Sequence, residues 1–499
     1  MTAFLEQPAE ILARLARLRE EDAPTHGGHV LSYVYDSGLA ELDDLAAAAI
    51  RMVQPVNGLD PTTFTSVAVM EREVIGFART MLHGPDDVVG TVTTGGTESC
   101  LLAVKTARDN WRATHPGGRG RLLAPVTVHA AFQKAAHYFD LELDLVPVDE
   151  DGTLPASRLL DRLGDDVALV VVSAPSYPFA ALDPVEDVAA TCLAAAVDCH
   201  VDACIGGWVL PFWSELPAWD FRVDGVTSVS ADLHKFGYAP KGASVLLQRG
   251  RDRQRSQYFA TTRWPGYPVV NPTILGSKSA GALAAGWAII HALGSRGLAA
   301  LAESCERSTT ALVALVEAIP GLCVVGHPVG PLLAVAADES VPVAERVDPH
   351  HWADRARAHG WLLQLQPGLA QPDGTHLPHT THLTVTPVTE GVFAELSAAL
   401  VLAADEVRGV PPVTAADVLG GLPPAMVAGL SSPDAVPLDA EAAYGLLVQI
   451  GLIVPGEGSG ALPERMAPFI ALIEALPTAL TERLLTELLA RLVEPVTRS

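Results

Sequence analysis

Residues 88–112 read VVGTVTTGGTESCLLAVKTARDNWR, a strand pattern followed directly by a helix pattern. The β-branched run Val88–Thr93 predicts a buried strand. From Glu98 to about Arg112, apolar residues recur on one helical face, which predicts a helix. Further short apolar runs follow, separated mostly by helix-like segments or loops, at 126–128, 143–148, 168–173, 197–201, 226–230 and 243–248. Buried strands alternating with helices predict an α/β fold with a mostly parallel sheet covered on both faces.

The predicted first strand and helix are joined by Thr94-Gly95-Gly96-Thr97. Glycines let a backbone approach a ligand closely, and the free N–H groups at the start of a helix bind phosphate. An ordinary glycine-rich turn has the same pattern. Taken alone, the motif therefore indicates a phosphate site about as strongly as it indicates a plain turn.

The 499 residues suggest two or three domains. We expect a helical N-terminal segment at 1–85, a large α/β domain at 86–290, a smaller α/β domain at 291–409 and a C-terminal extension at 410–499. Strands of the smaller domain are predicted at 332–336, 361–365 and 382–386. The extension is rich in Pro and Gly up to residue 437 and then helical, apart from an interruption at Pro455–Gly460. Near the start of the chain, Leu12, Leu15 and Leu18 share one face, which predicts a helix packed against another surface.

Composition and charge exclude several classes of partner. The chain has 33 Lys and Arg against 58 Asp and Glu, for a net charge of −25. Such a surface repels nucleic acid and anionic membranes. The six cysteines contain no Cys-x-x-Cys pair, so we expect neither a structural zinc site nor a disulfide framework, and a reducing cytoplasm is the expected location. The N-terminus lacks a secretory signal pattern and no apolar run approaches the ~20 residues of a membrane span, so we expect a soluble protein.

Two polar residues follow predicted strands at the sheet edge where open α/β sheets bind ligands. Asp202 could keep a pyridine nitrogen protonated there, which strengthens the ring as an electron sink. His129 could stack on an aromatic cofactor. For Asp202 the plain alternative is a capping or loop carboxylate, which is the better interpretation of an isolated Asp. For His129 the plain alternative is a core or capping histidine.

Lys235 closes the stretch Ser228–Lys235, SVSADLHK, after another apolar run. A single lysine is normally a solvated surface residue. This one lies between Leu233 and Phe236, so we expect burial to lower its pKa and to make its amine a usable nucleophile.

In this order along the chain, the phosphate turn, histidine, aspartate and lysine resemble the group II pyridoxal-phosphate decarboxylase superfamily, most closely its sphingosine-1-phosphate lyases. The resemblance covers roughly residues 25–405. It is carried by TTGGTESCLLAVK at 93–105, VHAAFQKAAHYF at 128–139, HVDACIGGWVLPF at 200–212, SVSADLHKFGYAPKGASVLLQ at 228–248 and WPGYPVVNPTILGSKSAG at 264–281.

The resemblance implies pyridoxal-phosphate fold type I, the aspartate-aminotransferase-like fold, with pyridoxal 5'-phosphate as the cofactor. Lys235 would form the Schiff base, His129 would stack on the ring and Asp202 would pair with its nitrogen. The residues implied to hold the cofactor phosphate are Gly95, Gly96, Thr97 and His234. Gly276 and Ser277 would reach that phosphate from a neighbouring subunit, which implies a homodimer.

The motif HKFGYAPKG at 234–242 resembles the lyases, whereas the decarboxylases usually continue as His-Lys-Trp. The resemblance implies retro-aldol cleavage of a 2-amino-3-hydroxy substrate, with Tyr35 and Lys241 at the substrate phosphate. An amino-acid decarboxylase is the alternative, and a pseudoenzyme that binds the cofactor only for structure is a third hypothesis. Asp60 occupies the position of a histidine that contributes to the phosphate pocket of the lyases. A carboxylate facing a phosphate is unfavourable, so a substrate without phosphate is also conceivable.

Overall fold

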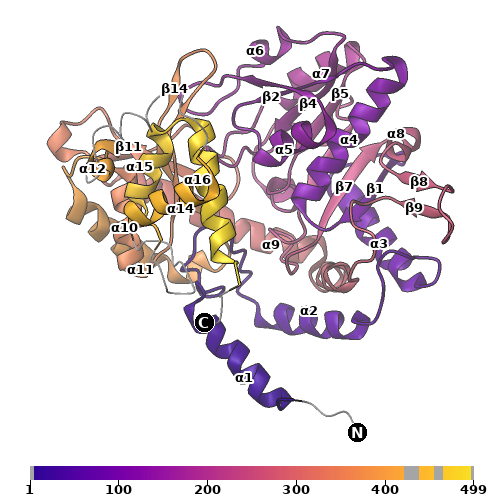
Figure 1. Ribbon diagram of the computed structural model, residues 1–499, viewed down its shortest axis with the longest axis horizontal. Helices are drawn as coiled ribbons and strands as arrows, with labels where there is room; N and C mark the ends of the chain where they lie inside the picture. The colour runs from indigo at the N-terminus through magenta and orange to yellow at the C-terminus, as the bar shows by residue number, and fades with distance from the viewer. Residues whose placement is uncertain (1–4, 421–437, 454–464, 496–499) are drawn as a thin grey trace.

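The computed structural model describes residues 5–420, 438–453 and 465–495. Its first strand and helix lie where the sequence predicts them, with β1 at Val88–Thr93 and α4 at Gly96–Thr114. Figure 1 shows a large sheet surrounded by helices, beside a smaller sheet that carries the C-terminal helices. The predicted α/β class is confirmed.

The large sheet has seven strands in the order β1-β7-β6-β5-β4-β2-β3. The pairs between β6 and β3 are all parallel, whereas β7 is antiparallel to both of its neighbours, so six strands point the same way. After β1, the strands are β2 Arg121–Pro125, β3 Glu142–Val146, β4 Val167–Ser173, β5 Asp198–Asp202, β6 Ser228–Ala231 and β7 Ser244–Arg249. The predicted mostly parallel sheet is therefore confirmed.

The second strand differs from the expectation. The apolar run Val126–Val128 was the predicted strand, but β2 ends at Pro125 and the run forms a turn that leads to His129. The strand begins with Arg121, whose guanidinium is paired with the carboxylates of Asp144 and Asp166. Because β2 begins with a charged residue and ends with a proline, the short buried run 122–124 between them was not recognised as a strand.

Both faces of the large sheet are buried. Along β4, Val170 and Val172 belong to one apolar cluster, while Leu169 and Val171 belong to another. Successive side chains of a strand point to opposite faces, so each face has its own core. The helices of this region are α2 Ala40–Val53, α3 Thr65–Met81, α4, α5 Ala130–Phe139, α6 Ala156–Leu160, α7 Val185–Ala194, α8 Arg251–Arg255 and α9 Gly281–Glu317.

The long helix α9 leads to the smaller sheet, with a break at Gly294 where the backbone leaves helical geometry (φ 55°, ψ −171°). This antiparallel sheet has the order β10-β11-β15-β12. Its elements are β10 Leu322–Val324, β11 Leu332–Ala337, α10 Pro349–Ala358, β12 Gln364–Gln366, β15 Thr380–Thr384 and α11 Thr389–Val407. Two hairpins project from the chain, β8 Phe259–Thr261 with β9 Val269–Asn271, and β13 Leu369–Ala370 with β14 His376–Leu377.

Helix α1, Pro8–Leu18, extends away from the other helices at the bottom of Figure 1. Leu12 and Leu18 are 64% and 68% exposed, and no residue of the helix is buried within the described part of the chain. The expectation that its apolar face packs on another surface is wrong for the single chain.

The C-terminal extension contains α12 Ala415–Leu419, α14 Ala440–Gln449, α15 Ala467–Ala475 and α16 Thr478–Leu492, which share a core of leucines. The carboxylate of Asp354 on α10 accepts hydrogen bonds from the amides of Met466 (2.8 Å) and Ala467 (3.0 Å), which fixes the start of α15. The described part of the extension therefore packs on the smaller sheet and its helices. Of the predicted Pro- and Gly-rich stretch Val410–Pro437, residues 421–437 lie outside the described residues, as does the interruption at Pro455–Gly460.

Candidate active site

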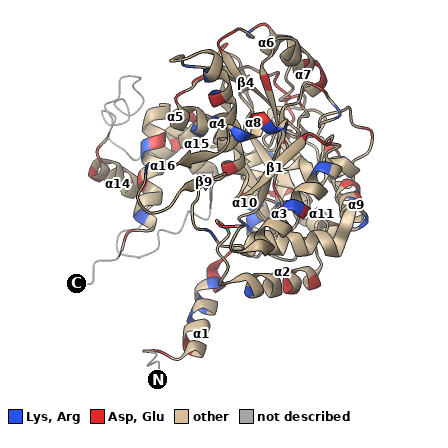
Figure 2. Ribbon diagram, turned by 90° about the vertical axis from the view of Figure 1, so that its right-hand side faces the viewer, with Lys and Arg blue, Asp and Glu red and all other residues tan. Residues whose placement is uncertain are grey.

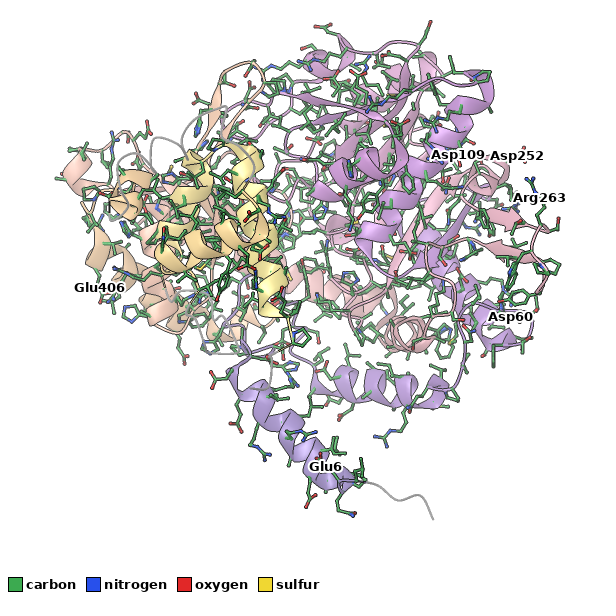
Figure 3. All side chains as sticks on the ribbon, viewed as in Figure 1. Glu6, Asp60, Asp109, Asp252, Arg263 and Glu406 are labelled. Atoms are coloured by element: carbon green, nitrogen blue, oxygen red, sulfur yellow. The ribbon has the colours of Figure 1, made fainter. Side chains whose placement is uncertain are left out.

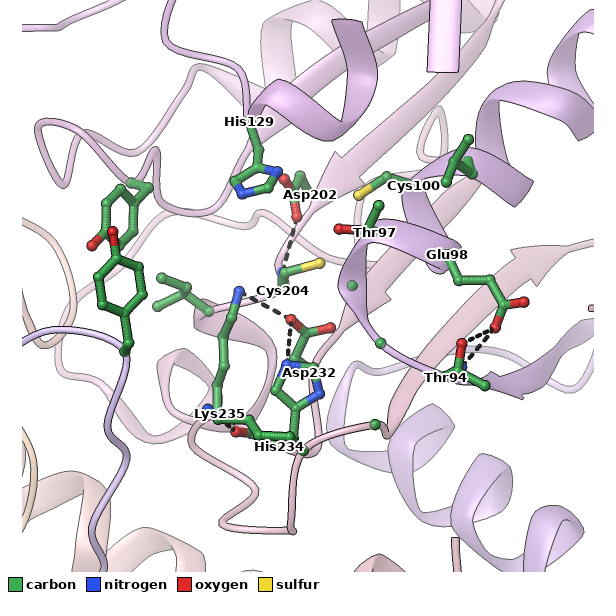
Figure 4. Close-up of a pocket in the computed structure, with 18 of the residues that line it drawn as sticks. Thr94, Thr97, Glu98, Cys100, His129, Asp202, Cys204, Asp232, His234 and Lys235 are labelled. Atoms are coloured by element: carbon green, nitrogen blue, oxygen red, sulfur yellow. Dashed lines mark hydrogen bonds and ion pairs between the residues drawn. The ribbon is translucent and has the colours of Figure 1, made fainter. Parts of the chain in front are cut away.

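A cavity of about 670 Å³ lies at the carboxyl ends of the parallel strands (Figure 4). It collects side chains that follow β1, β2, β4, β5 and β6, which is the edge where open α/β sheets bind ligands. The residues of the sequence-predicted site that line it are Tyr35, Gly95, Gly96, Thr97, His129, Asp202, His234, Lys235 and Lys241. The fold thus brings together residues that are up to 206 positions apart in the sequence.

The turn after β1 lets a ligand come close to the backbone. Gly95 has φ 143°, a conformation that residues with a side chain rarely adopt, and α4 begins at the next residue. A Cβ on Gly96 would lie 2.5 Å from an oxygen of Asp232, so only glycine fits there. No side chain in the described residues caps the start of α4, which leaves its first N–H groups for an anion.

Lys235 is held by a carboxylate rather than by apolar surroundings alone. Its Nζ lies 3.0 Å from Oδ2 of Asp232, and Nε2 of His234 lies 3.5 Å from the same oxygen. Burial alone would lower the pKa of Lys235, but the charge of Asp232 outweighs it and the pKa lies well above the ordinary value for lysine. The expected lowering of the pKa is therefore wrong for this environment. Lys235 is therefore an ammonium that forms an ion pair with the Asp232 carboxylate.

Asp202, at the end of β5, is a buried anion. Its Oδ1 accepts hydrogen bonds from the amide of Cys204 (3.1 Å) and from Oγ of Ser230 (3.3 Å). Burial raises the pKa of Asp202, but the nearby His129, the Cys204 side chain and Lys235 more than offset it, so the pKa lies below the ordinary value. A carboxylate that stays ionised in a buried cavity suits a protonated ring nitrogen.

His129 is the N-cap of α5, where its Nδ1 accepts a hydrogen bond from the amide of Ala131 (3.2 Å). Figure 4 shows its ring beside Asp202 on the cavity wall. Capping is the plain alternative for this histidine, and the structure shows the capping bond. The same bond fixes the ring where it faces the cavity, so the two roles are compatible.

Tyr35 and Lys241 form an aromatic and basic part of the cavity wall. Nζ of Lys241 lies 4.5 Å from the ring centre of Tyr35 and donates a hydrogen bond to the carbonyl of His234 (3.2 Å). Burial raises the pKa of Tyr35 to about 12, so its phenol stays protonated. Partial burial, together with Lys235, lowers the pKa of Lys241 to about 8. This part of the wall can therefore hold an anionic group through Lys241 below about pH 8.

Three predicted residues lie outside the cavity of their own chain. Asp60 occupies a turn at the edge of the molecule (Figure 3), where its carboxylate accepts hydrogen bonds from Thr62 and Thr63. These bonds hold the pKa of Asp60 well below the ordinary range. Gly276 and Ser277 are exposed on a neighbouring loop and line no part of the cavity described here.

Two acidic residues of the site were not assigned from the sequence. Asp232 precedes Lys235 by three positions, a spacing that places two side chains on one side of a helical turn. Glu98 accepts hydrogen bonds from the amide and hydroxyl of Thr94 (2.7 and 2.8 Å) and from the amide of Ile274 (2.7 Å). It ties the glycine turn to the loop that carries Gly276. In the sequence, only the position of Glu98 next to the glycine turn indicated that it belongs to the site.

The small sheet also contributes to the site through a contact that local sequence patterns do not reveal. The ring of Tyr177 lines the cavity and stacks on His382 of β15, with ring centres 4.1 Å apart. Burial lowers the pKa of His382 to about 3, so this imidazole is neutral. Burial likewise raises the pKa of Tyr177 and keeps the phenol protonated.

The residues fit pyridoxal 5'-phosphate on three separate grounds. A helix start with free N–H groups suits its phosphate, the ionised Asp202 suits its ring nitrogen, and the amine of Lys235 lines the same cavity. Fold and site together define a pyridoxal-phosphate-dependent enzyme of fold type I.

The chain belongs to the pyridoxal-dependent decarboxylase family, whose conserved domain matches residues 39–331. It is 35% identical over 325 residues to the sphingosine-1-phosphate lyase of Dictyostelium discoideum, a match that covers 63% of this chain and 60% of that protein. The solved structure of the sphingosine-1-phosphate lyase of Burkholderia pseudomallei is 32% identical with a TM-score of 0.74, covering 82% of this chain and 93% of that one. The glutamate decarboxylase of Lactobacillus brevis, at 20% identity and a TM-score of 0.71 over 83% and 96% of the two chains, shares the fold. The predicted family and cofactor are confirmed.

Residues 416–491 match a second model, described as a pyridoxal-dependent enzyme C-terminal putative HTH domain. This segment has nine acidic and only three basic residues. Figure 2 shows acidic and basic residues interspersed along the ribbon. A segment with this charge does not favour the phosphate contacts on which nucleic-acid binding depends. Among the described residues, no helix is long and apolar enough to cross a membrane.

Proposed function

We propose that this protein is a carbon–carbon lyase that cleaves a 2-amino-3-hydroxy substrate between Cα and Cβ and releases an aldehyde. The observation that carries the proposal is a second amine in the cavity, Lys241, whose Nζ lies 4.5 Å from the ring centre of Tyr35. It gives the substrate an anion anchor separate from the cofactor phosphate. The similarity to lyases supports the same activity.

The bound cofactor supplies an electron sink for the pair released when the Cα–Cβ bond breaks. Asp202 maintains the charge of that sink, because its pKa is lowered and it stays ionised. Lys235 takes up the proton of the substrate hydroxyl as a neutral amine. Asp232, whose Oδ2 lies 3.0 Å from Nζ, stabilises the resulting ammonium, which then returns a proton to Cα. Tyr35 and Lys241 position the far end of the substrate.

An amino-acid decarboxylase remains the second candidate, because Lys241 would hold a substrate carboxylate as well as a phosphate. The two activities leave different products. We expect the holoenzyme to release an aldehyde, trapped as a hydrazone, from phosphorylated or unphosphorylated 2-amino-3-hydroxy compounds. Release of carbon dioxide without any aldehyde would exclude the lyase in favour of the decarboxylase.

Lys241 predicts how binding depends on pH. Its ammonium loses its proton as the pH rises through about 8, so KM for an anionic substrate should rise above pH 8 by up to about tenfold per pH unit. Lys241→Gln should raise KM at pH 7 by about ten- to a hundredfold and remove this pH dependence. Lys241→Arg should keep KM low at higher pH, because arginine stays charged. An unchanged KM profile in Lys241→Gln would mean that Lys241 does not hold the substrate.

We also propose that the protein is a homodimer, located in a reducing cytoplasm, as its six free cysteines suggest. Large apolar side chains are exposed on the β8–β9 hairpin and the loop after it, namely Phe259, Trp264, Tyr267, Val270, Ile274 and Leu275. Ile274 and Leu275 also line the cavity. A second copy that covers this surface would contact the mouth of the site, and Gly276 and Ser277 would lie at the boundary between the two subunits. The exposed face of α1 offers a further contact.

A shared site predicts complementation between two inactive variants. A Cβ on Gly276 meets nothing within 4 Å in its own chain, so Gly276→Leu should fold but obstruct the neighbouring site. Lys235→Ala should be inactive in its own site. Mixed and re-equilibrated, the two variants should recover about a quarter of wild-type activity, because half of the dimers then carry one intact site. No recovery, with hybrid dimers demonstrated by mass, would contradict the shared site.

Asp60 provides a test of whether the substrate carries a phosphate. Its segment is fixed to the Gly276 loop, since the amide of Gly58 donates to the carbonyl of Lys278 (2.8 Å) and Asn57 donates to Oγ of Ser277 (3.3 Å). If that loop reaches a neighbouring site, Asp60 lies close to it. Asp60→His should then raise kcat/KM for a phosphorylated sphingoid base by about tenfold, because an anion is removed. Asp60→Asn serves as the uncharged control, and no change in either variant would place Asp60 outside the substrate site.

A further inference from the structure

Three metal-binding side chains meet at the wall of the cavity. The Sγ atoms of Cys100 and Cys204 and a carboxylate oxygen of Asp202 all lie within 4.8 Å of one another. The three residues are 1%, 7% and 8% exposed, and all three line the cavity. Figure 4 shows both sulfurs on the side of the cavity where α4 begins.

Two thiolates and one carboxylate are a donor set typical of a thiophilic divalent cation such as Zn²⁺. Tetrahedral zinc with bonds of about 2.3 Å to sulfur holds its two sulfurs roughly 3.8 Å apart. The observed limit of 4.8 Å means that these side chains need to move by no more than about 1 Å. The backbone amide of Cys204 already donates a hydrogen bond to Asp202, so two of the three candidate metal ligands are held close together.

We propose that Cys100, Cys204 and Asp202 bind a zinc-class cation in the cofactor-free enzyme, and that this cation and pyridoxal 5'-phosphate exclude each other. On binding, the two thiols release their protons to solvent and the cation takes two Sγ atoms and one carboxylate oxygen as ligands. Asp202 is also the carboxylate that fits the cofactor ring nitrogen. Its Oδ1 already accepts hydrogen bonds from the Cys204 amide and Ser230, so the cation and the ring nitrogen would compete for Oδ2. The site therefore makes cofactor loading sensitive to thiophilic cations, whichever bond the enzyme cleaves.

A second thiol pair provides a matched control. Cys192 on α7 and Cys199 on β5 interact with each other and are both fully buried in the core. Neither lines the cavity, and the cation-ligand cluster does not include them. If two adjacent thiols were sufficient, this pair would bind the cation too, whereas the proposal requires the cavity and Asp202.

The test titrates Cd²⁺ into the apoenzyme under a phosphine reductant and follows the ultraviolet sulfur-to-cadmium charge-transfer band. We expect one Cd²⁺ per chain, loss of the band in Cys100→Ala and in Cys204→Ala, and retention in Cys192→Ala, with Zn²⁺ displacing Cd²⁺. Far-ultraviolet circular dichroism checks that each variant is folded, and two independent cavity variants cover the case in which one does not fold.

Competition with the cofactor provides the second readout. Cd²⁺ at a hundred times its Kd should raise the apparent Kd of pyridoxal 5'-phosphate about a hundredfold, and prior loading with the cofactor should prevent the band. The proposal is overturned if the apoenzyme shows no band, if the band persists in both cavity variants, or if the cofactor binds equally well with the cation present. None of these readouts involves the substrate, so a failure here is distinct from a failure of the proposed lyase activity.

Discussion

Replacing Lys235 by alanine is expected to lower turnover by at least about a thousandfold. Lys235 is the amine beside Asp232 in the cavity that Asp202 and the glycine turn also line, and the proposed mechanism requires it to move two protons. The second amine of the cavity, Lys241, is held by the carbonyl of His234 and faces Tyr35, so it is not placed to substitute. Borohydride reduction followed by peptide mass analysis should find the cofactor on Lys235 in the wild type and not in the variant.

Lys134→Ala is the matched control, because this exposed lysine lies on α5 with its Nζ near the ring of Tyr138. It should keep wild-type turnover and cofactor labelling at Lys235. Normal turnover by a folded Lys235→Ala variant would contradict the mechanism. It would leave the structural, non-catalytic use of the cofactor as the remaining explanation.

The sequence predicted the large sheet well because its inner strands β4, β5 and β6 are almost wholly buried. Runs such as Val167–Ser173 are then continuously apolar, and a glycine turn marks the start of α4. The prediction failed at β2, where Arg121 begins the strand and its charge is neutralised only by residues distant in the sequence. Local patterns do not show such long-range pairing.

The pKa of Lys235 shows the same limit for the site. The apolar neighbours Leu233 and Phe236 suggested a lowered pKa, but the pKa depends on where Asp232 points, and the fold aims its carboxylate at Nζ. The stacking of Tyr177 on His382 was likewise not predictable, because it joins the two sheets. Residues along one strand or turn were found from the sequence, whereas contacts between distant segments needed the structure.

Helix α1 illustrates a third limit, in which the pattern was recognised but its partner was not. Its leucines share one face, as predicted, yet that face is exposed in the single chain. An amphipathic pattern shows that a surface favours burial and does not show what buries it. In the proposed homodimer the second subunit is the candidate partner for this face.

Asp202→Asn is expected to lower kcat by about a hundred- to ten-thousandfold, with a smaller change in cofactor affinity. The amide has almost the same shape, and its oxygen can still accept the hydrogen bonds from the Cys204 amide and Ser230. Only the negative charge is lost, so the ring nitrogen is no longer held protonated and the electron sink weakens. The start of α4 and Lys235 still bind the cofactor in this variant. We therefore expect kcat to fall much more than the affinity for the cofactor. Steady-state kinetics with a cofactor titration measures both quantities.

The same strand offers the control. Asp198 begins β5, at the opposite end from Asp202, and pairs with Arg253 at 3.0 Å, away from the cavity. Asp198→Asn should leave kcat within about twofold of wild type, because a charge lost at that end of the strand does not face the cofactor site. Equal losses in the two variants would mean that β5 is merely destabilised. A normal kcat in Asp202→Asn would mean that the ring nitrogen does not depend on this carboxylate, and the cation site proposed above would then be the remaining reason for a buried anion between two thiols.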